Sequence, residues 1–117
     1  MNQEIDPFTR AYIVAALWAG LDDDDEPLDK NYSPQDLDPK ALSSMMEDCR
    51  KFQTENAALM VDLDPEQCGH DFLLTRNGHG TGFWDRDLGE LGKELTKVSR
   101  QFREFDLYVG DDGKLYV

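Results

Sequence analysis

The sequence is poor in basic residues, since 12 Lys and Arg stand against 25 Asp and Glu and give a formal net charge of −13. Affinity for nucleic acids and for anionic membranes comes mostly from Lys and Arg, so the composition argues against direct binding to either. No apolar run approaches the roughly 18–20 residues of a membrane span. The first residues also lack the basic start and apolar stretch of a signal peptide. We therefore expect a cytoplasmic protein that does not contact membranes.

Cysteine and histidine are scarce. The two cysteines, Cys49 and Cys68, are expected to be reduced and buried, as is usual in the cytoplasm. Both histidines, His70 and His79, lie close to Cys68 in the sequence, and these three residues are possible zinc ligands with an Asp as a fourth. Their spacing matches no standard zinc signature, so the sequence predicts no metal and no other cofactor.

The remaining composition is typical of one folded domain. The chain has 117 residues, of which 39% are hydrophobic, and we predict a single domain over 1–117. Residues 1–66 hold 16 acids and 5 bases and are predicted to be mostly helical, whereas residues 67–117 hold 9 acids and 7 bases and are predicted to contain the strands. The only candidate linker, around residues 62–69, is too short to separate two domains.

Two helices are predicted in the acidic half, each beginning at an Asp-Pro pair that suits the N-cap and first helical positions. The first runs from Asp6-Pro7 to about Leu21, and the second from Asp38-Pro39 to about Val61. The first is apolar nearly all round, which is typical of a central helix or of one shared with a partner chain, so a homodimer is possible. Its Val14 and Trp18 share one face.

The second half predicts short strands around one more helix. We expect a strand over 71–76, a Gly-rich turn over 77–82, a helix that begins with a capping box at Asp87 and Glu90 and continues to Phe102, and a hairpin of strands 106–109 and 114–117. The predicted fold is therefore α+β, with three helices packed on a small three-stranded antiparallel sheet in the order α-α-β-α-β-β. Trp18, Phe83 and Trp84 are expected in the core.

An acidic connection of unusual length joins the first two helices. It spans residues 22–38 and begins with five adjacent carboxylates: Asp22, Asp23, Asp24, Asp25 and Glu26. A calcium loop of the EF-hand type is excluded, because Pro27 stands where such a loop requires glycine. The run is either a solvated loop or a surface that binds a partner, and Leu28, Tyr32 and Leu37 are expected to pin it to the domain.

The stretch from His70 to Asp85 is the densest in chemically active side chains. A histidine beside Asp71 or Asp85 is a possible general base, with Cys68, Thr75 or Thr81 as a nucleophile, although no catalytic motif is present. The other interpretation is a contact surface for a partner. Its candidate binding residues are His70, Arg76, Asn77, His79 and Trp84.

Two segments carry a resemblance to a known group of proteins: the block 70–86, which reads HDFLLTRNGHGTGFWDR, and the C-terminal segment 106–113. Together with 15–18, 27–29 and 48–49, they resemble a family of small, uncharacterised, acidic bacteriophage-encoded proteins over nearly the full length. The resemblance implies a phage product that acts inside a bacterial host cell. It brings no established activity, so it assigns no catalytic residues.

These observations favour an acidic interaction protein that binds a host or phage protein and inhibits, for example, a defence or nucleic-acid-processing factor. One alternative is a small metal-dependent or hydrolytic enzyme that uses His70 and His79. A second is a mimic of DNA, which requires the acids of the first two helices to line one face of the molecule.

Overall fold

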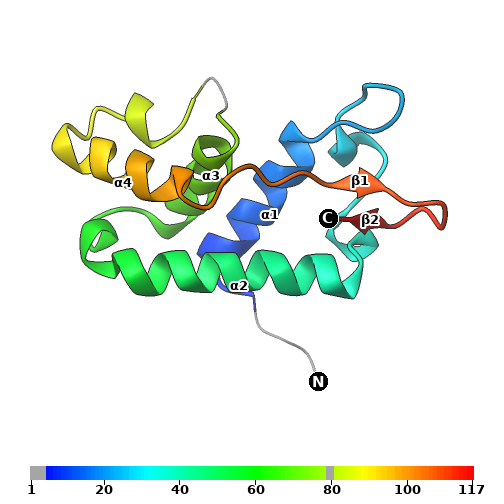
Figure 1. Cartoon of the computed structure of the whole chain (residues 1–117), viewed down its shortest axis with the longest axis horizontal. Helices are drawn as coiled ribbons and strands as arrows, with labels where there is room; N and C mark the ends of the chain where they lie inside the picture. The colour runs from blue at the N-terminus through cyan, green and yellow to red at the C-terminus, as the bar shows by residue number, and fades with distance from the viewer. Residues whose placement is uncertain (1–4, 79–80) are drawn as a thin grey trace.

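A computed structural model of the chain describes residues 5–78 and 81–117. Its helices are α1 (Pro7–Ala19), α2 (Pro39–Asn56), α3 (Pro65–Arg76) and α4 (Glu90–Arg100), and its strands are β1 (Tyr108–Val109) and β2 (Leu115–Tyr116). Four short 3-10 turns complete the described structure: η1 (Leu28–Lys30), η2 (Pro34–Asp36), η3 (Ala57–Met60) and η4 (Phe83–Asp85). The molecule measures 44 × 35 × 20 Å, with α4 and the β1–β2 hairpin at opposite ends of its long axis (Figure 1).

Three of the four α-helices begin at an Asp-Pro pair. The carboxylates of Asp6, Asp38 and Asp64 accept hydrogen bonds from the backbone N–H groups of Thr9 (2.7 Å), Lys40 (3.0 Å) and Gln67 (3.0 Å). Each bond satisfies one of the free N–H groups of a first helical turn. The predicted starts of α1 and α2 are therefore confirmed. The third pair, which lies in the stretch considered as a linker around residues 62–69, begins α3.

The predicted strand over 71–76 is wrong, because these residues form the second half of α3. Every side chain from Asp71 to Arg76 is buried. A helix that is buried on all sides shows no polar face, and a short apolar run of this kind cannot be told from a buried strand by periodicity. The misassigned residues are thus the fully buried half of a helix.

The predicted three-stranded sheet is replaced by a two-stranded antiparallel hairpin in the described residues, in which Tyr108 pairs with Tyr116 and Val109 with Leu115. Beside β2, Leu37 forms a parallel bridge with Leu115, and the N–H of Asp38 donates to the Leu115 carbonyl at 2.8 Å. The long connection before α2 therefore takes the place of the missing strand. The α-helices and strands follow the order α-α-α-α-β-β.

The predicted capping box of the last helix is also wrong. Helix α4 begins at Glu90 after Gly89, whose φ of 63° favours glycine, and no side chain caps it. Its apolar face is as predicted, because Leu95 is buried and further residues of that face pack against the core: Leu88, Leu91, Val98 and Phe102.

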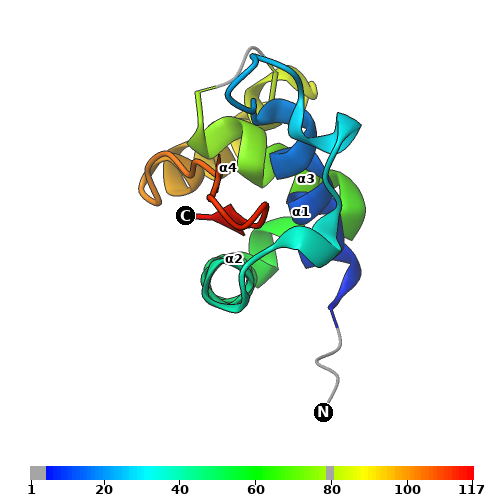
Figure 2. The ribbon, with the colours of Figure 1, turned by 90° about the vertical axis from the view of Figure 1, so that its right-hand side faces the viewer.

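Aromatic rings form the centre of the core. Phe52 of α2 stacks on Phe72 of α3 with ring centroids 4.1 Å apart, and Phe102 meets Phe72 edge-on at 5.0 Å. Helices α1 and α3 lie side by side (Figures 1 and 2), and a Cβ atom added at Gly69 would lie 2.0 Å from the Phe8 carbonyl oxygen. Glycine is therefore required where these two helices touch.

The two tryptophans do not join the core as predicted. Trp18 is 49% exposed and Trp84 is 48% exposed, whereas Phe83 is buried. Cys49 and Cys68 are buried free thiols, as expected. In the parts of the chain that the structure describes, none of the helices combines the length and the apolarity that crossing a membrane requires.

One buried guanidinium joins four parts of the chain. From the end of α3, Arg76 donates to the carbonyl oxygens of Phe102 and Arg103, both at 2.7 Å, and to the Tyr12 hydroxyl and the Asp48 carboxylate, both at 2.9 Å. These acceptors lie just after α4, on α1 and on α2. The Arg76 guanidinium also lies 5.5 Å from each of the three phenylalanine rings around it: Phe72, Phe102 and Phe105.

Lysine is expected to be a poor substitute at this position. Arg76→Lys keeps the charge, but a single ammonium cannot reproduce a planar fork that reaches four acceptors. We expect the free energy of unfolding to fall by about 2–4 kcal/mol, because the buried Tyr12 hydroxyl and the partly buried carbonyls and carboxylate around it lose their donors. Arg50→Lys, at an exposed arginine of α2, is the control and should cost less than about 0.5 kcal/mol. Urea unfolding measures the free energy of unfolding of both variants and of the wild type. Equal losses in the two variants would contradict this role for Arg76.

Candidate functional site

The acidic run forms a closed turn. The N–H of Asp22 donates to the Glu26 carbonyl at 2.9 Å, and the Asp22 carboxylate accepts from the N–H groups of Asp24 (2.8 Å) and Glu26 (3.0 Å). Leu21 and Pro27 pair across its base. Asp22 is thus committed to shaping the turn, while the side chains of Asp23, Asp24 and Asp25 are exposed. We call residues 22–26 the acidic turn.

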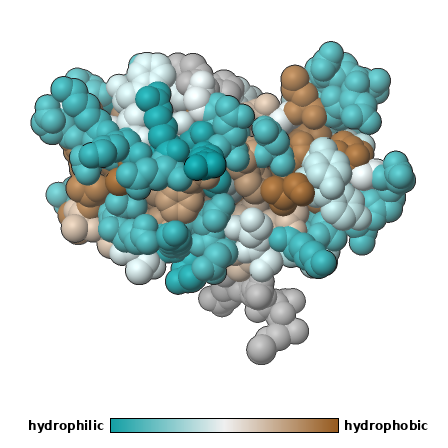
Figure 3. Space-filling model, viewed as in Figure 1, coloured by the Kyte–Doolittle hydropathy of each residue, from teal (hydrophilic) through white to brown (hydrophobic). Residues whose placement is uncertain are grey.

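The chain after the acidic turn holds it on the domain. Leu28 is fully buried and Leu37 nearly so, and Tyr32 packs against the core, which confirms the predicted pinning. Lys30 forms an ion pair with Glu26 at 3.3 Å. The acidic turn therefore stands on a fixed base, at the hydrophilic corner beyond the end of α1 (Figures 1 and 3).

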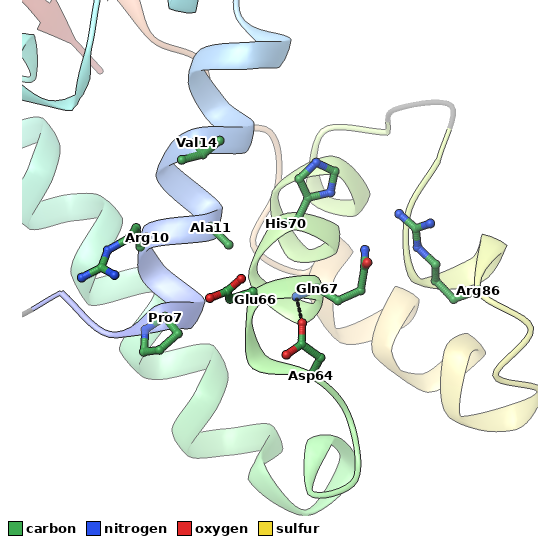
Figure 4. Close-up of a pocket in the computed structure, with 9 residues that line it drawn as sticks. All are labelled: Pro7, Arg10, Ala11, Val14, Asp64, Glu66, Gln67, His70 and Arg86. Atoms are coloured by element: carbon green, nitrogen blue, oxygen red, sulfur yellow. Dashed lines mark hydrogen bonds between the residues drawn. The ribbon is translucent and has the colours of Figure 1, made fainter.

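A groove of about 490 Å³ runs between α1 and α3. Its lining comes from α1, through Pro7, Arg10, Ala11 and Val14, and from the start of α3, through Asp64, Glu66, Gln67 and His70, with Arg86 at one edge. Figure 4 shows that both helices begin at the same end of the groove, with His70 towards the other end. We call this feature the α1–α3 groove.

A buried ion pair fixes one edge of the α1–α3 groove. The Asp71 carboxylate is 1% exposed and receives two bonds from Arg86, Nε to Oδ2 at 3.0 Å and Nη2 to Oδ1 at 2.8 Å. Gln67 donates a further bond to Asp71 at 3.1 Å. These hydrogen bonds raise the pKa of Arg86 above its usual value. The side chain of Arg86 is therefore held in place within the fold.

His70 forms part of the wall of the α1–α3 groove and makes no hydrogen bond with the neighbouring Asp71 in the described residues. Its Nδ1 lies 3.7 Å from Asp71 Oδ1, which is too long for a hydrogen bond, and makes no other hydrogen bond within residues 5–78 and 81–117. The Trp18 ring lies 6.2 Å away between centroids. Side chains of a helix lean towards its N-terminus, so Trp18 reaches back along α1 to His70.

The candidate nucleophiles are engaged elsewhere or shielded. Thr75 Oγ1 accepts a hydrogen bond from the N–H of Phe83 at 3.1 Å, and Thr81 donates to Asp85 at 3.1 Å. Burial raises the pKa of Cys68 to about 11, which keeps its thiol protonated at neutral pH. Among the described residues, no group of three His, Cys, Asp or Glu side chains is arranged to hold a metal ion.

The predicted binding residues do not form one site. His70 lies at the α1–α3 groove and the acidic turn lies beyond α1, whereas Arg76 is buried. Asn77 pairs with the backbone of Phe105, donating to its carbonyl at 2.9 Å and accepting from its N–H at 2.7 Å. Trp84 is half-exposed on the segment that leads to α4. The prediction for His79 falls outside the described residues.

Several groove residues were missed from the sequence: Arg10, Val14, Gln67 and Arg86. Val14 and Trp18 were placed on one face of the first helix, but an all-round apolar helix does not reveal which of its faces stays exposed. The pairing of Asp71 with Arg86 spans fifteen residues and could not be inferred while 71–76 was assigned to a strand. Comparisons with protein-family models, curated proteins and solved structures found no match.

The buried thiols give the folded protein a characteristic response to pH. Burial raises the pKa of Cys68 to about 11 and also raises that of Cys49, whereas an unfolded thiol ionises near about 8.5. Above about pH 8.5 the unfolded state binds fewer protons, so the free energy of unfolding should fall as pH rises towards 11. Below about 8.5 this stabilisation is complete.

Cys68→Ala should make the fall of the free energy of unfolding with rising pH less steep, because one buried thiol is removed. Urea unfolding at several pH values between about 7 and 10.5 measures this slope. In the native protein at about pH 8, both thiols should be silent to Ellman's reagent and should react on unfolding. Rapid reaction of native Cys68 would contradict the burial described above.

Proposed function

We propose that this chain is a non-enzymatic interaction protein that binds a basic surface of another protein through the acidic turn. The observation that carries the proposal is the form of that turn. The Asp22 carboxylate accepts hydrogen bonds from two backbone N–H groups of the turn. The side chains of Asp23, Asp24 and Asp25 are exposed and adjacent in the sequence. Because these hydrogen bonds order the loop before a partner binds, the entropic cost of binding is lower.

The charge of the whole molecule supports the same proposal. A net charge of −13 attracts a basic partner from a distance, speeds its association and repels acidic competitors. Each base that is paired within the chain takes up one acid as well, so pairs such as Arg76–Asp48 and Arg86–Asp71 leave the net charge unchanged. Lys30 pairs with Glu26 of the acidic turn, whereas the side chains of Asp23, Asp24 and Asp25 are exposed and carry negative charge at that end of the molecule.

The resemblance to bacteriophage proteins supports a biological setting. In this proposal the protein acts in the cytoplasm of an infected bacterium and its partner is a host or phage protein. Inhibition of a defence or nucleic-acid-processing factor fits an acidic ligand, because such factors present basic surfaces. The acidic turn would then cover the surface on which the factor binds phosphates.

The two alternatives have less support. An enzyme built on His70 needs an oriented base, yet both Asp71 oxygens bond to Arg86. A DNA mimic built on the first two helices needs carboxylates from both of them. Helix α1 carries no Asp or Glu between Pro7 and Ala19. We therefore propose neither.

Charge-neutral variants test the proposal. Tagged protein is used to capture partners from bacterial lysate at increasing salt, with the wild type compared with Asp23→Asn/Asp24→Asn/Asp25→Asn. We expect this variant to capture about fivefold less partner at low salt and to show a flatter salt dependence, because screened attractions have been removed.

The matched control removes the same number of charges elsewhere, through Glu55→Gln/Asp62→Asn/Glu94→Gln at three exposed positions. It should capture partner nearly as well as the wild type. Equal losses in the two variants would reduce the effect to net charge, and no loss in either would remove the acidic turn from the account.

A further inference from the structure

We propose that the α1–α3 groove is the anchoring half of the same interface and receives a bulky apolar side chain from a basic segment of the partner protein. This inference rests on the proposed function, because the acidic turn attracts the segment that the groove then holds. The α1–α3 groove gives the interface what a charged turn lacks, namely apolar area that is removed from water on binding.

Two large apolar side chains are exposed at the groove or beside it. Val14 is 53% exposed and Trp18 is 49% exposed, and their spacing of four residues places them together on one face of α1. Scattered exposed apolar side chains are normal. Here, however, Val14 lines the groove, and Trp18, one turn further along α1, lies beside His70, which lines it too. Val14 and Ala11 line the groove itself, so an inserted side chain would contact aliphatic carbon.

The groove is large enough and is formed in advance. A volume of about 490 Å³ lies within the range of about 300–1,000 Å³ that is typical of ligand sites. Arg86 is locked at one edge by its two bonds to Asp71, and His70 lies against the Trp18 ring at the end away from Pro7. Binding therefore requires little ordering of these walls.

The carboxylates at one end of the groove, and above all those of the acidic turn beyond the other end, favour a basic segment. Asp71 neutralises Arg86, so the remaining charged groups of the lining are Arg10 and the two exposed acids Asp64 and Glu66. The acidic turn begins three residues after α1 ends, which adds carboxylates beyond the other end of the helix. Lys or Arg residues on either side of an apolar anchor would thus lie near Asp64 and Glu66 at one end of the groove and near the acidic turn beyond the other end. A second copy of this chain is a poor occupant, because each copy carries a charge of −13.

Two fluorescent peptides test the inference. Both are short, of equal length and equal Lys content, and one carries a central Trp-Leu pair where the other carries Ala-Ala. We expect the wild type to bind the Trp-Leu peptide about tenfold more tightly, because only this peptide places bulky apolar side chains in the groove. Fluorescence anisotropy measures both affinities.

Substitutions in and beside the groove test whether the preference for the Trp-Leu peptide arises there. Val14→Gln/Trp18→Gln removes apolar surface without a charge change, and Ala11→Gln fills the groove while leaving Trp18 intact. Both should bind the two peptides equally. The matched control, Val61→Gln/Val117→Gln, alters two exposed apolar residues outside the lining and should keep the full preference. Circular dichroism establishes that each variant is folded.

Three results would overturn the inference: equal binding of both peptides by the wild type, an unchanged preference in the folded groove variants, or a wild-type dimer that the groove variants dissociate. The Asp23→Asn/Asp24→Asn/Asp25→Asn variant separates the two proposals. If this variant binds both peptides more weakly while the wild type shows no preference, the result supports the role of the acidic turn and contradicts that of the groove. If the variant changes neither affinity while the preference for the Trp-Leu peptide persists, the result contradicts the role of the acidic turn instead.

Discussion

The guanidinium of Arg76 is the interaction on which the rest of this structure depends. It ends α3 and, inside the core, bonds α1 through Tyr12, α2 through Asp48 and the segment after α4 through two carbonyl oxygens. A charge can be buried at such a place only when its hydrogen-bond donors are satisfied and its partners are fixed. Because α3 is thereby held at the centre, α1 must pack directly on it, and Gly69 allows the contact with Phe8. The α1–α3 groove lies on the outer side of that contact.

This arrangement divides the most distinctive stretch of the sequence into two roles. Thr75, Arg76 and Asn77 turn inward and bond to backbone far along the chain, so their chemistry is used in folding. The surfaces that we propose for a partner belong mainly to α1 and to the acidic turn that follows it. One helix thus joins the α1–α3 groove, whose lining mixes aliphatic and charged side chains, to a cluster of exposed carboxylates, and the proposed basic partner with one apolar anchor uses both at once.

The sequence allowed α1, α2, the hairpin and the pinned acidic loop to be predicted, because capping, turn chemistry and periodicity are local signals. Helix α3 was missed although Asp64-Pro65 repeats the same start, since its second half is buried on every side and shows no polar face that would mark a helix. The exposure of Trp18 and Trp84 could not be predicted, because composition does not say which apolar face stays uncovered. The α1–α3 groove depends on α3, so it could not be foreseen while residues 71–76 were taken for a strand. The acidic turn, in contrast, was visible as a candidate from its run of carboxylates.

The central claim is that partners bind along α1, from the α1–α3 groove to the acidic turn, while the residues around Arg76 serve the fold. Mapping of amide chemical shifts by NMR, during titration with the Lys-rich Trp-Leu peptide, tests this most directly. The account predicts shifts confined to residues 10–26, 64–70 and 86, with the β1–β2 hairpin and α4 unchanged. Shifts concentrated in the hairpin or in α4, with α1 silent, would contradict it.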